Sequence, residues 1–271
     1  MENQQAKKFY ETVADYYDKD ADLGFKQRAE ANPLLDKIRN DFRRITIKYP
    51  FSKVLEIGCG PGFDVCWFAK NYPKAMVTGV DISAKMVEIA NEQIAEQNLN
   101  NAKAFVSDER ELLGKFGKEA FDLVYVYFGA LNTVADLKYS ADQIHKLLKP
   151  GGHAVLTFVN KWYLREMVVQ ALKLNFKTAF ARLKREWGGY SIDRHLPSQC
   201  YSPGSIKSAF NDFSLLERKG YSIRFPAWYN PHKVKNNPEL AEELWRKDQE
   251  LQSSWWWSKG EYTLFVFRKE E

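Results

Sequence analysis

A glycine-rich segment follows the first apolar run in the central part of the chain. The run Val54-Leu-Glu-Ile57 leads into Gly58-Cys59-Gly60-Pro61-Gly62, and a helical pattern starts at Phe63. A strand, a glycine loop and a helix in this order present backbone N–H groups at the carboxyl edge of a parallel sheet, where ligands bind. Glycine is required because a Cβ atom would block the close approach of a ligand. The segment therefore predicts a site for a nucleotide-like ligand.

The type of ligand follows from what this loop lacks. A dinucleotide fingerprint needs glycine at its sixth position, where this chain has Phe63, and Pro61 removes one backbone donor. No Gly-Lys-Ser/Thr follows, which excludes a phosphate-binding P-loop. The loop suits a ligand with an adenosine and an amino-acid end but no phosphate. An NAD-dependent dehydrogenase is the alternative that these features disfavour.

Two acidic residues end the next two predicted strands. Asp81 comes about twenty residues after the glycine loop, the spacing at which an acidic side chain accepts hydrogen bonds from ribose hydroxyls. Asp108 ends the third strand in the same topological place, where it can accept from an adenine amino group beside the backbone N–H of Glu109. Both acids also have a simpler explanation, because carboxylates commonly lie at the N-terminus of a following helix. Their positions nevertheless favour an adenosyl ligand.

The elements that position these residues alternate between strands and helices. Short apolar runs predict strands, and runs with helical periodicity predict helices between them. The strands are predicted at residues 53–57, 75–80, 102–106, 121–128 and 153–159, and the helices at 63–71, 84–97 and 135–148. This alternation is typical of an α/β doubly wound, mostly parallel sheet with helices on both faces. Two further strands are predicted at residues 215–225 and 262–267, connected through a helix at 238–251.

The order of these elements predicts one domain over residues 1–271. Its expected parts are a helical N-terminal flap (1–45), a cofactor-binding core (46–160), an inserted helical cap (161–200) and the C-terminal part of the sheet (201–271). The cap is predicted to contain one long helix, 161–187, that ends at Gly188-Gly189. Its apolar residues share a face, and we expect this face to pack over the sheet edge as a lid.

Five segments of the chain match, in order and at similar spacing, the motifs of a known family. They read VLEIGCGPG, VDIS, SDERELL, FDLVYVYFGALN and LLKPGGHAVL. With them the chain resembles the class I (Rossmann-like) S-adenosylmethionine-dependent methyltransferases, in particular those of the small-molecule type. The resemblance covers residues 52–159 strongly and the terminal strands loosely. It implies a seven-stranded sheet with an antiparallel C-terminal hairpin, S-adenosyl-L-methionine as cofactor and S-adenosyl-L-homocysteine as product.

The resemblance also implies roles for residues of this chain. Glu56 supports the site, the glycine loop meets the methionine part of the cofactor, and Asp81 holds its ribose. The position of Asp108 meets adenine, and Tyr17 closes over the cofactor from the flap unless it serves packing alone. The implied cofactor-binding residues are Glu56, Gly58, Cys59, Gly60, Asp81, Ile82, Met86, Ser107, Asp108, Glu109, Tyr127, Phe128 and Tyr17.

The methyl acceptor is indicated only by composition and by the inserted cap. The chain has 8 Trp, 14 Tyr and 18 Phe, and aromatic side chains line pockets for flat or apolar ligands. We therefore expect a small organic acceptor that is aromatic or hydrophobic. Methyl transfer from a sulfonium needs alignment and exclusion of water more than a fixed catalytic residue. Candidates for orienting or deprotonating the acceptor are His195 and Tyr201, our two catalytic predictions, together with Asn132 and Tyr190.

Two other functions remain open on the same motifs. The cap carries a basic stripe that would suit RNA or another macromolecular substrate, formed by Lys161, Arg165, Lys173, Lys177, Arg182, Lys184 and Arg185. Glu166 and Glu186 interrupt this stripe, which favours a solvated helix face and makes nucleic acid a disfavoured partner. The third hypothesis is a non-catalytic S-adenosylmethionine-binding protein, because a fold alone does not fix a function.

Bulk composition limits the function further. The net charge of +5 is too small to indicate nucleic-acid binding on its own. The cysteines, Cys59, Cys66 and Cys200, lack the spacing of metal ligands, so we predict no metal site and a reducing compartment. No run of ~18 apolar residues predicts a transmembrane helix, and the polar N-terminus does not resemble a secretory signal. We therefore expect a cytoplasmic protein, whose oligomeric state the sequence does not indicate.

Overall fold

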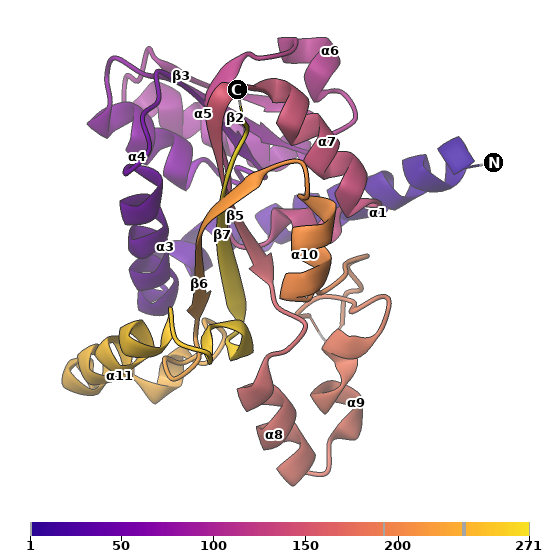
Figure 1. Cartoon of the computed structure of the whole chain (residues 1–271), viewed down its shortest axis with the longest axis vertical. Coiled ribbons are helices and arrows are strands. Elements are labelled where there is room, and N and C mark those ends of the chain that lie inside the picture. The colour runs from indigo at the N-terminus through magenta and orange to yellow at the C-terminus, as the bar shows by residue number, and fades with distance from the viewer. Residues whose placement is uncertain (1, 192, 235–236, 271) are drawn as a thin grey trace.

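A seven-stranded sheet forms the centre of the computed structural model, which describes residues 2–191, 193–234 and 237–270 (Figure 1). The strand order is β3-β2-β1-β4-β5-β7-β6. Neighbouring strands from β3 to β5 are parallel, whereas β7 pairs antiparallel with both β5 and β6. The strands are β1 Lys53–Ile57, β2 Met76–Asp81, β3 Ala102–Val106, β4 Phe121–Val126, β5 Leu148–Val159, β6 Ser214–Tyr221 and β7 Tyr262–Arg268. The predicted mostly parallel sheet with an antiparallel C-terminal hairpin is confirmed.

Helices cover both faces of this sheet, as a doubly wound fold requires. One apolar cluster joins the sheet to α3 (Pro33–Thr46), α4 (Phe63–Asn71), α5 (Ala84–Glu96) and α11 (Pro238–Leu251). A second cluster joins the opposite face to α6 (Leu112–Phe116), α7 (Leu137–Leu147) and α10 (Pro203–Ala209). Figure 1 shows α3 and α4 on one side of the strands and α7 and α10 on the other. The carboxyl ends of the parallel strands stay free of these two layers.

Short polar side chains set where several helices begin. Ser83 Oγ accepts from the backbone N–H of Met86 at 3.1 Å, and Asp136 caps α7 in the same way. Asn237 caps α11, which has proline at its first position, where the missing N–H needs no partner. Ser202 forms a reciprocal capping box at the start of α10. These caps fix the loops between strands and helices, and with them the residues at the strand ends.

Two helices precede α3 and lie over the carboxyl end of the sheet. They are α1 (Glu2–Asp22) and α2 (Phe25–Glu30). Asp18 of α1 accepts from Ser83 Oγ at 2.5 Å, and Asp22 forms an ion pair with Lys85. Tyr10 and Val13 of α1 are buried. The N-terminal helix is therefore anchored at the start of α5, directly beside the end of β2.

Three strand boundaries differ by two or more residues from those predicted. β6 ends at Tyr221 and not at 225, because the backbone of Ser222 turns to a φ of 58°. β4 ends at Val126 and not at Phe128, because the backbone of Phe128 turns to a φ of 53° and Gly129 follows at 80°. β5 begins at Leu148 and not at 153, because Leu148 already pairs with Phe121. Gly151 takes a φ of 73°, so the Pro-Gly-Gly segment bends within the strand and does not precede it. Apolar periodicity alone does not reveal these backbone turns.

The predicted long helix 161–187 of the cap is wrong. The segment forms α8 (Leu164–Leu172), α9 (Phe176–Ala179) and the short 3-10 helix η2 (Ala181–Leu183). The break comes at Leu174, whose φ is 58°, and the Asn175 side chain caps the next turn. The apolar face of α8 does not pack over the sheet edge, because none of its residues is buried. In Figure 1 α8 and α9 project away from the sheet.

No helix of the described residues is long and apolar enough to cross a membrane.

Candidate active site

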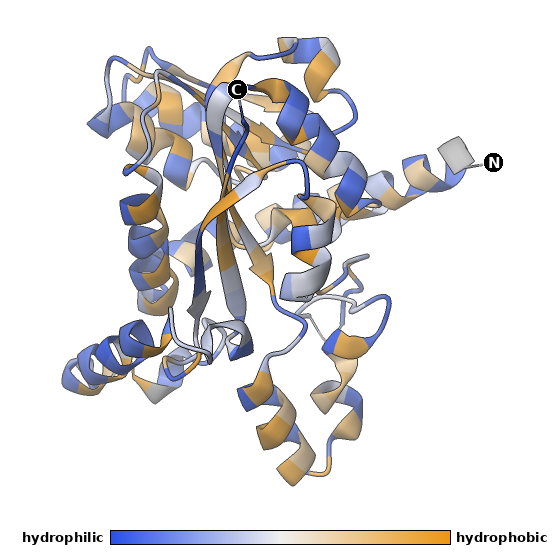
Figure 2. Cartoon of the chain, viewed as in Figure 1, coloured by the Kyte–Doolittle hydropathy of each residue, from blue (hydrophilic) through white to orange (hydrophobic). Residues whose placement is uncertain are grey.

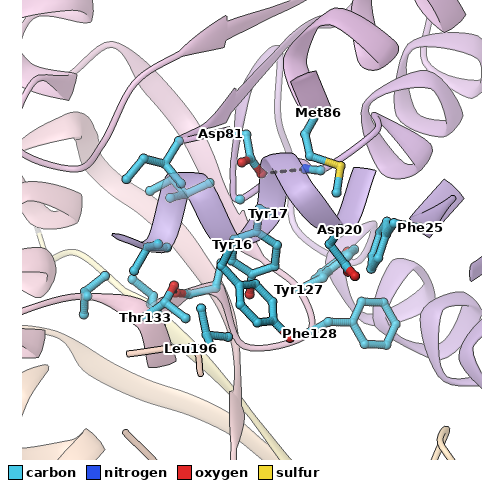
Figure 3. Close-up of a pocket in the computed structure, with 18 of the residues that line it drawn as sticks. Tyr16, Tyr17, Asp20, Phe25, Asp81, Met86, Tyr127, Phe128, Thr133 and Leu196 are labelled. Atoms are coloured by element: carbon cyan, nitrogen blue, oxygen red, sulfur yellow. Dashed lines mark hydrogen bonds between the residues drawn. The ribbon is translucent and has the colours of Figure 1, made fainter. Parts of the chain in front are cut away.

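A cavity of about 260 Å³ lies at the carboxyl ends of the parallel strands. Its walls come from segments far apart in the sequence: the glycine loop, the ends of β2 to β4, the helices α1 to α3, and residues of the cap and the C-terminal part. Figure 3 shows Tyr16, Tyr17 and Asp20 of α1 around the same pocket as Asp81 at the end of β2 and Tyr127 and Phe128 after β4. The cavity therefore lies where ligands of open α/β sheets bind.

The glycine loop needs glycine for two different reasons. Gly58 has a φ of 77°, and a Cβ atom built on it would lie 2.3 Å from the Ala130 Cβ. Gly60 has a φ of 51°, yet nothing lies within 4 Å of an added Cβ atom. Because Gly60 lines the cavity, this open space belongs to the ligand site. Gly58 thus serves folding, whereas Gly60 allows close approach to the backbone.

Asp81 is held rigidly at the end of β2. Its Oδ2 accepts from the backbone N–H of Gly60 at 2.8 Å, and its Oδ1 accepts from that of Ser83 at 2.9 Å. Burial raises the pKa of this carboxyl, and the two backbone hydrogen bonds oppose that rise. Each carboxylate oxygen keeps a lone pair for a further donor. The side chain can thus accept from a ligand hydroxyl without a change of its own position.

The end of β3 forms a second polar wall. Tyr10 of α1 donates a hydrogen bond to Glu109 and accepts one from the backbone N–H of Ala135 at 3.2 Å. The guanidinium of Arg110 stacks on the Tyr10 ring at 4.3 Å and donates to Asp108 Oδ1 at 3.0 Å. Burial raises the pKa of Glu109, so this carboxyl is less easily ionised than an exposed one. The N-terminal helix and the third strand end are thus joined by one hydrogen-bonded group beside the cavity.

Arg39 of α3 lines the cavity, and the sequence analysis missed it. Its guanidinium lies 4.6 Å from the Phe63 ring and 5.1 Å from that of Phe128, and its Nε is 3.5 Å from Asp64 Oδ2. Among the described residues the buried Nε has no hydrogen-bond partner. No motif marks this arginine, because it belongs to an amphipathic helix whose basic residues look alike in the sequence. It is the positive group best placed to meet an anionic ligand group.

The opposite end of the cavity is aromatic. It is formed by Phe128, Tyr190, Trp228 and Tyr262, which contact one another through their rings and through the Tyr190 and Tyr262 hydroxyls, 3.4 Å apart. Tyr190 packs edge-on against Trp228, with ring centroids 5.0 Å apart. Among the described residues the indole Nε1 of Trp228 is buried without a hydrogen-bond partner. This end combines apolar rings with unused polar atoms, which is typical of a site for a small organic ligand.

A buried charged group supports the aromatic end. Tyr190 donates to Glu261 Oε1 at 2.7 Å, and Tyr229 donates to Glu166 Oε1 at 2.8 Å. Arg182 lies between the two carboxylates, 2.8 Å from Glu166 Oε2 and 3.6 Å from Glu261 Oε1. Burial raises the pKa of Glu261 to about 7, against the opposing effects of Arg182 and Tyr190. The cap is joined to the last strand through this group.

Most of the predicted cofactor residues meet at the cavity. Those that line it are Tyr17, Gly58, Gly60, Asp81, Ile82, Met86, Ser107, Asp108, Glu109, Tyr127 and Phe128. Glu56 does not line it, because it lies buried behind the loop and accepts from Tyr125 Oη at 3.0 Å. Burial, and then Asp64, raise the pKa of Glu56 well above its usual range. Cys59 is also outside, since its Sγ packs against the Gly79 backbone of β2.

The two predicted catalytic residues do not line the cavity. His195 is exposed and pairs with Glu186 at the surface of the cap. Tyr201 is buried in the apolar layer on the other face of the sheet, edge-on to Phe158. Asn132 binds the backbone of Val159 and serves structure. Of the four candidates, Tyr190 alone lies in the cavity, because acceptor-side residues come from separate segments without a shared motif.

Comparisons with known proteins agree with this geometry. Residues 54–152 match a family described as a methyltransferase domain. A malonyl-[acyl-carrier protein] O-methyltransferase of Priestia megaterium is 27% identical over 59% of this chain, and the alignment spans about half of that protein (53%). The uncharacterized protein MJ1252 of Methanocaldococcus jannaschii is 26% identical over 86% of this chain and 81% of its own length. A similar solved structure is a complex between the Haloferax volcanii Trm112 methyltransferase activator and a putative methyltransferase. The matching chain of that complex has a TM-score of 0.60 and 17% sequence identity, and the match covers 94% of this protein and 98% of the matching chain.

The fold, the glycine loop and this domain match agree with one another. Residues 54–152 match a methyltransferase domain, and the sheet around them has the fold of the solved methyltransferases that it resembles. Two of the solved structures with this fold hold S-adenosylmethionine or S-adenosylhomocysteine. Asp81, the free space at Gly60 and the phosphate-free loop are suited to that ligand.

Proposed function

We propose that this protein transfers a methyl group from S-adenosylmethionine to a small, largely apolar organic acceptor. The observation that carries the proposal is one cavity that joins the glycine loop and Asp81 to an aromatic end. The aromatic end lies within the protein, under the N-terminal helices and the residues of the cap that reach it. A macromolecular substrate would need an open groove at this end. A free small molecule needs only a pocket.

We propose one orientation for the cofactor in the cavity. Asp81 accepts from the ribose hydroxyls, and the wall of Ser107, Asp108 and Glu109 meets adenine. The methionine part then runs along Gly58 and Gly60. Its carboxylate reaches the guanidinium of Arg39, which lines the cavity and offers a charge-assisted hydrogen bond. This orientation directs the methyl-bearing sulfonium toward Phe128 and the aromatic end.

The chemistry is an in-line displacement at the methyl carbon. The acceptor atom forms a bond to carbon while the carbon–sulfur bond breaks, and sulfur keeps the electron pair as a neutral thioether. Alignment of the acceptor about 3 Å from the methyl group supplies most of the rate enhancement, because the bimolecular step becomes effectively unimolecular. Aromatic rings around the acceptor also leave less room for water molecules that would compete as nucleophiles.

Tyr190 is the residue we assign to the acceptor's polar group. Its hydroxyl donates to Glu261, and its oxygen can accept a hydrogen bond from an acceptor O–H or N–H in place of the Tyr262 hydroxyl, which lies 3.4 Å away. The proton that such an acceptor loses can pass through Tyr190 to Glu261, whose pKa of about 7 suits that role near neutral pH. Tyr190→Phe should therefore lower kcat about 10- to 100-fold with little change in cofactor affinity.

The proposal is tested with S-adenosylmethionine that carries a radiolabelled methyl group. The full-length protein is incubated with separated fractions of a bacterial extract: organic-soluble small molecules, total RNA, and protein. We expect label in the small-molecule fraction, and a loss of that label with Tyr190→Phe. Label confined to RNA or protein would overturn the proposed acceptor class. No label in any fraction, despite cofactor binding, would favour a binding protein without transfer.

A further inference from the structure

The tip of the cap leaves large apolar side chains in water. The cap hairpin, residues 161–185, contains α8, α9, η2 and the loops between them. In it Leu172 is 80% exposed, Leu174 78% and Phe176 55%. Figure 2 shows the apolar residues of this hairpin on the part that projects from the body of the molecule. An exposed apolar group of this kind marks a surface for a partner or a membrane.

The exposed residues form a continuous row. Leu164, Val168 and Leu172 are spaced four residues apart on α8, so they lie on one face of the helix. All three are exposed, at 38%, 48% and 80%. Leu174 and Phe176 continue the row around the turn, where the φ of 58° at Leu174 ends α8. The most exposed positions are those farthest along the hairpin, which suits insertion of the tip into an apolar layer.

The same hairpin is strongly basic. Residues 161–185 contain seven Lys and Arg side chains and one acidic residue, Glu166. Lys173 and Lys177 flank the apolar tip and are exposed. Both Glu166 oxygens are occupied, one by Arg182 and one by Tyr229. Arg182 itself is buried, so the predicted basic stripe lacks it at the surface. The remaining lysines and arginines give the tip a net positive charge.

Three kinds of partner can be compared by how well each would match the exposed apolar row and the positive charge of the hairpin. A second copy of the chain would bury the apolar row but would bring two positive faces together. An RNA would neutralise the lysines but would leave Leu172, Leu174 and Phe176 in water. An anionic membrane surface satisfies both, because apolar side chains enter the acyl boundary while lysines reach the headgroup phosphates.

We propose that the cap hairpin docks this protein on a membrane surface rich in anionic phospholipid. Leu172, Leu174 and Phe176 enter the lipid layer, and Lys173 and Lys177 bind the headgroups. The hairpin leads along the chain to Tyr190 and Leu196, which line the cavity. Docking therefore engages the segment that directly precedes these two cavity-lining residues. The proposal does not depend on the identity of the acceptor.

Vesicle flotation with the full-length protein tests the proposal. Vesicles of phosphatidylcholine alone are compared with vesicles of phosphatidylcholine and phosphatidylglycerol in equal parts. We expect binding to the mixed vesicles, with partitioning at least about tenfold stronger than to neutral ones, and weaker binding at high salt. Leu172→Ser with Leu174→Ser should reduce partitioning about tenfold or more, as should Lys173→Glu with Lys177→Glu.

The control is Leu23→Ser, which alters another exposed leucine, outside the cap. It should bind vesicles like the unchanged protein. Because all substituted residues are exposed, thermal melts of the variants should match that of the parent, which excludes misfolding as the cause. Absent vesicle binding, or binding unaffected by both double variants, would overturn the proposal. A concentration-dependent dimer that is lost with the Leu172 and Leu174 changes, without vesicle binding, would also overturn it and assign the row to a second copy.

Discussion

Individual side chains divide the cavity into ends with different chemistry. Asp81 and Glu109 supply acceptors where the adenosyl group is proposed to lie, and Tyr190 and Trp228 supply polar atoms among aromatic rings at the other end. Between them Arg39 is a cation next to the Phe128 ring. In S-adenosylmethionine the sulfonium that carries the methyl group joins the adenosyl part to the charged amino-acid part, so in the proposed orientation each part of the cofactor meets different residues. Substitutions at these residues should therefore affect different parts of the ligand.

Arg39 gives a prediction that separates the two parts of the cofactor. Arg39→Met keeps much of the apolar stem but removes the charge that we assign to the cofactor carboxylate. The affinity for S-adenosylhomocysteine should fall about tenfold or more, because a hydrogen bond to a charged group is lost. The affinity for 5′-methylthioadenosine, which lacks the carboxylate, should stay within about twofold. Titration calorimetry with both ligands measures this difference, and an equal loss for both would show that Arg39 supports the fold and not the carboxylate.

Glu261 gives a prediction on the pH dependence of stability. Its pKa is about 7 in the folded protein and 4.5 when the chain is unfolded. Below the lower value both states hold the proton, and between the two values only the folded state does. The free energy of unfolding should therefore fall as pH rises through this window, by roughly 2 to 3 kcal/mol, and then level off. Urea denaturation of the parent and Glu261→Gln at pH 5 and pH 7.5 tests this. Between these two pH values, the free energy of unfolding should decrease less in Glu261→Gln than in the parent, by about 2 to 3 kcal/mol. An identical decrease in both proteins would contradict the raised pKa of Glu261.

At the scale of elements, the N-terminal flap closes the cavity and is held by the cap. Arg194 donates to Asp20 Oδ1 at 2.5 Å and stacks on the Tyr16 ring at 4.4 Å. Both Tyr16 and Asp20 belong to α1 and line the cavity. Among the described residues, the hydrogen bonds, the ion pair and the cation–π contact between α1 and the cap all involve Arg194, so this arginine is the main polar link between them.

Arg194→Ala should therefore loosen the flap without weakening the core. We expect the dissociation rate of S-adenosylhomocysteine to rise about three- to tenfold, and backbone amides of residues 8–20 to exchange hydrogen faster. The melting temperature should change little, because Arg194 contacts no core strand. Arg246→Ala, which breaks an exposed ion pair with Glu250, is the control and should leave exchange in α1 unchanged. Unchanged release in the Arg194 variant would mean that closure does not depend on this contact.

Elements with a clear apolar periodicity were predictable from the sequence, whereas residues with a positive φ angle, at which strands and helices end, were not. β1, α4 and α11 have the predicted bounds, because each has a regular pattern between breaking residues. The end of β4 and the break in the cap depend on positive φ at Phe128 and Leu174, residue types that give no signal for it. The cofactor half of the site follows a local motif. The acceptor half does not, since Tyr190, Trp228 and Tyr262 come together only in three dimensions.

At the scale of the molecule, the sheet forms one half of the cavity, and the flap and the cap contribute to the other half. The strand ends hold Gly60 and Asp81 by backbone hydrogen bonds, which preorganises the cofactor end. The acceptor end depends on segments outside the core of the domain match at residues 54–152. Proteins with the same core can therefore bind the same methyl donor and differ in acceptor.

Calorimetric titration of the full-length protein with S-adenosylhomocysteine tests the central claim most directly. We predict one site per chain with a micromolar dissociation constant, and a loss of at least about tenfold in Asp81→Asn, because the ribose hydroxyls lose a charged acceptor. Asp212→Asn, which alters an exposed carboxylate paired with Lys138, should bind like the parent. No binding at millimolar ligand, or equal binding by the Asp81 variant, would contradict the account.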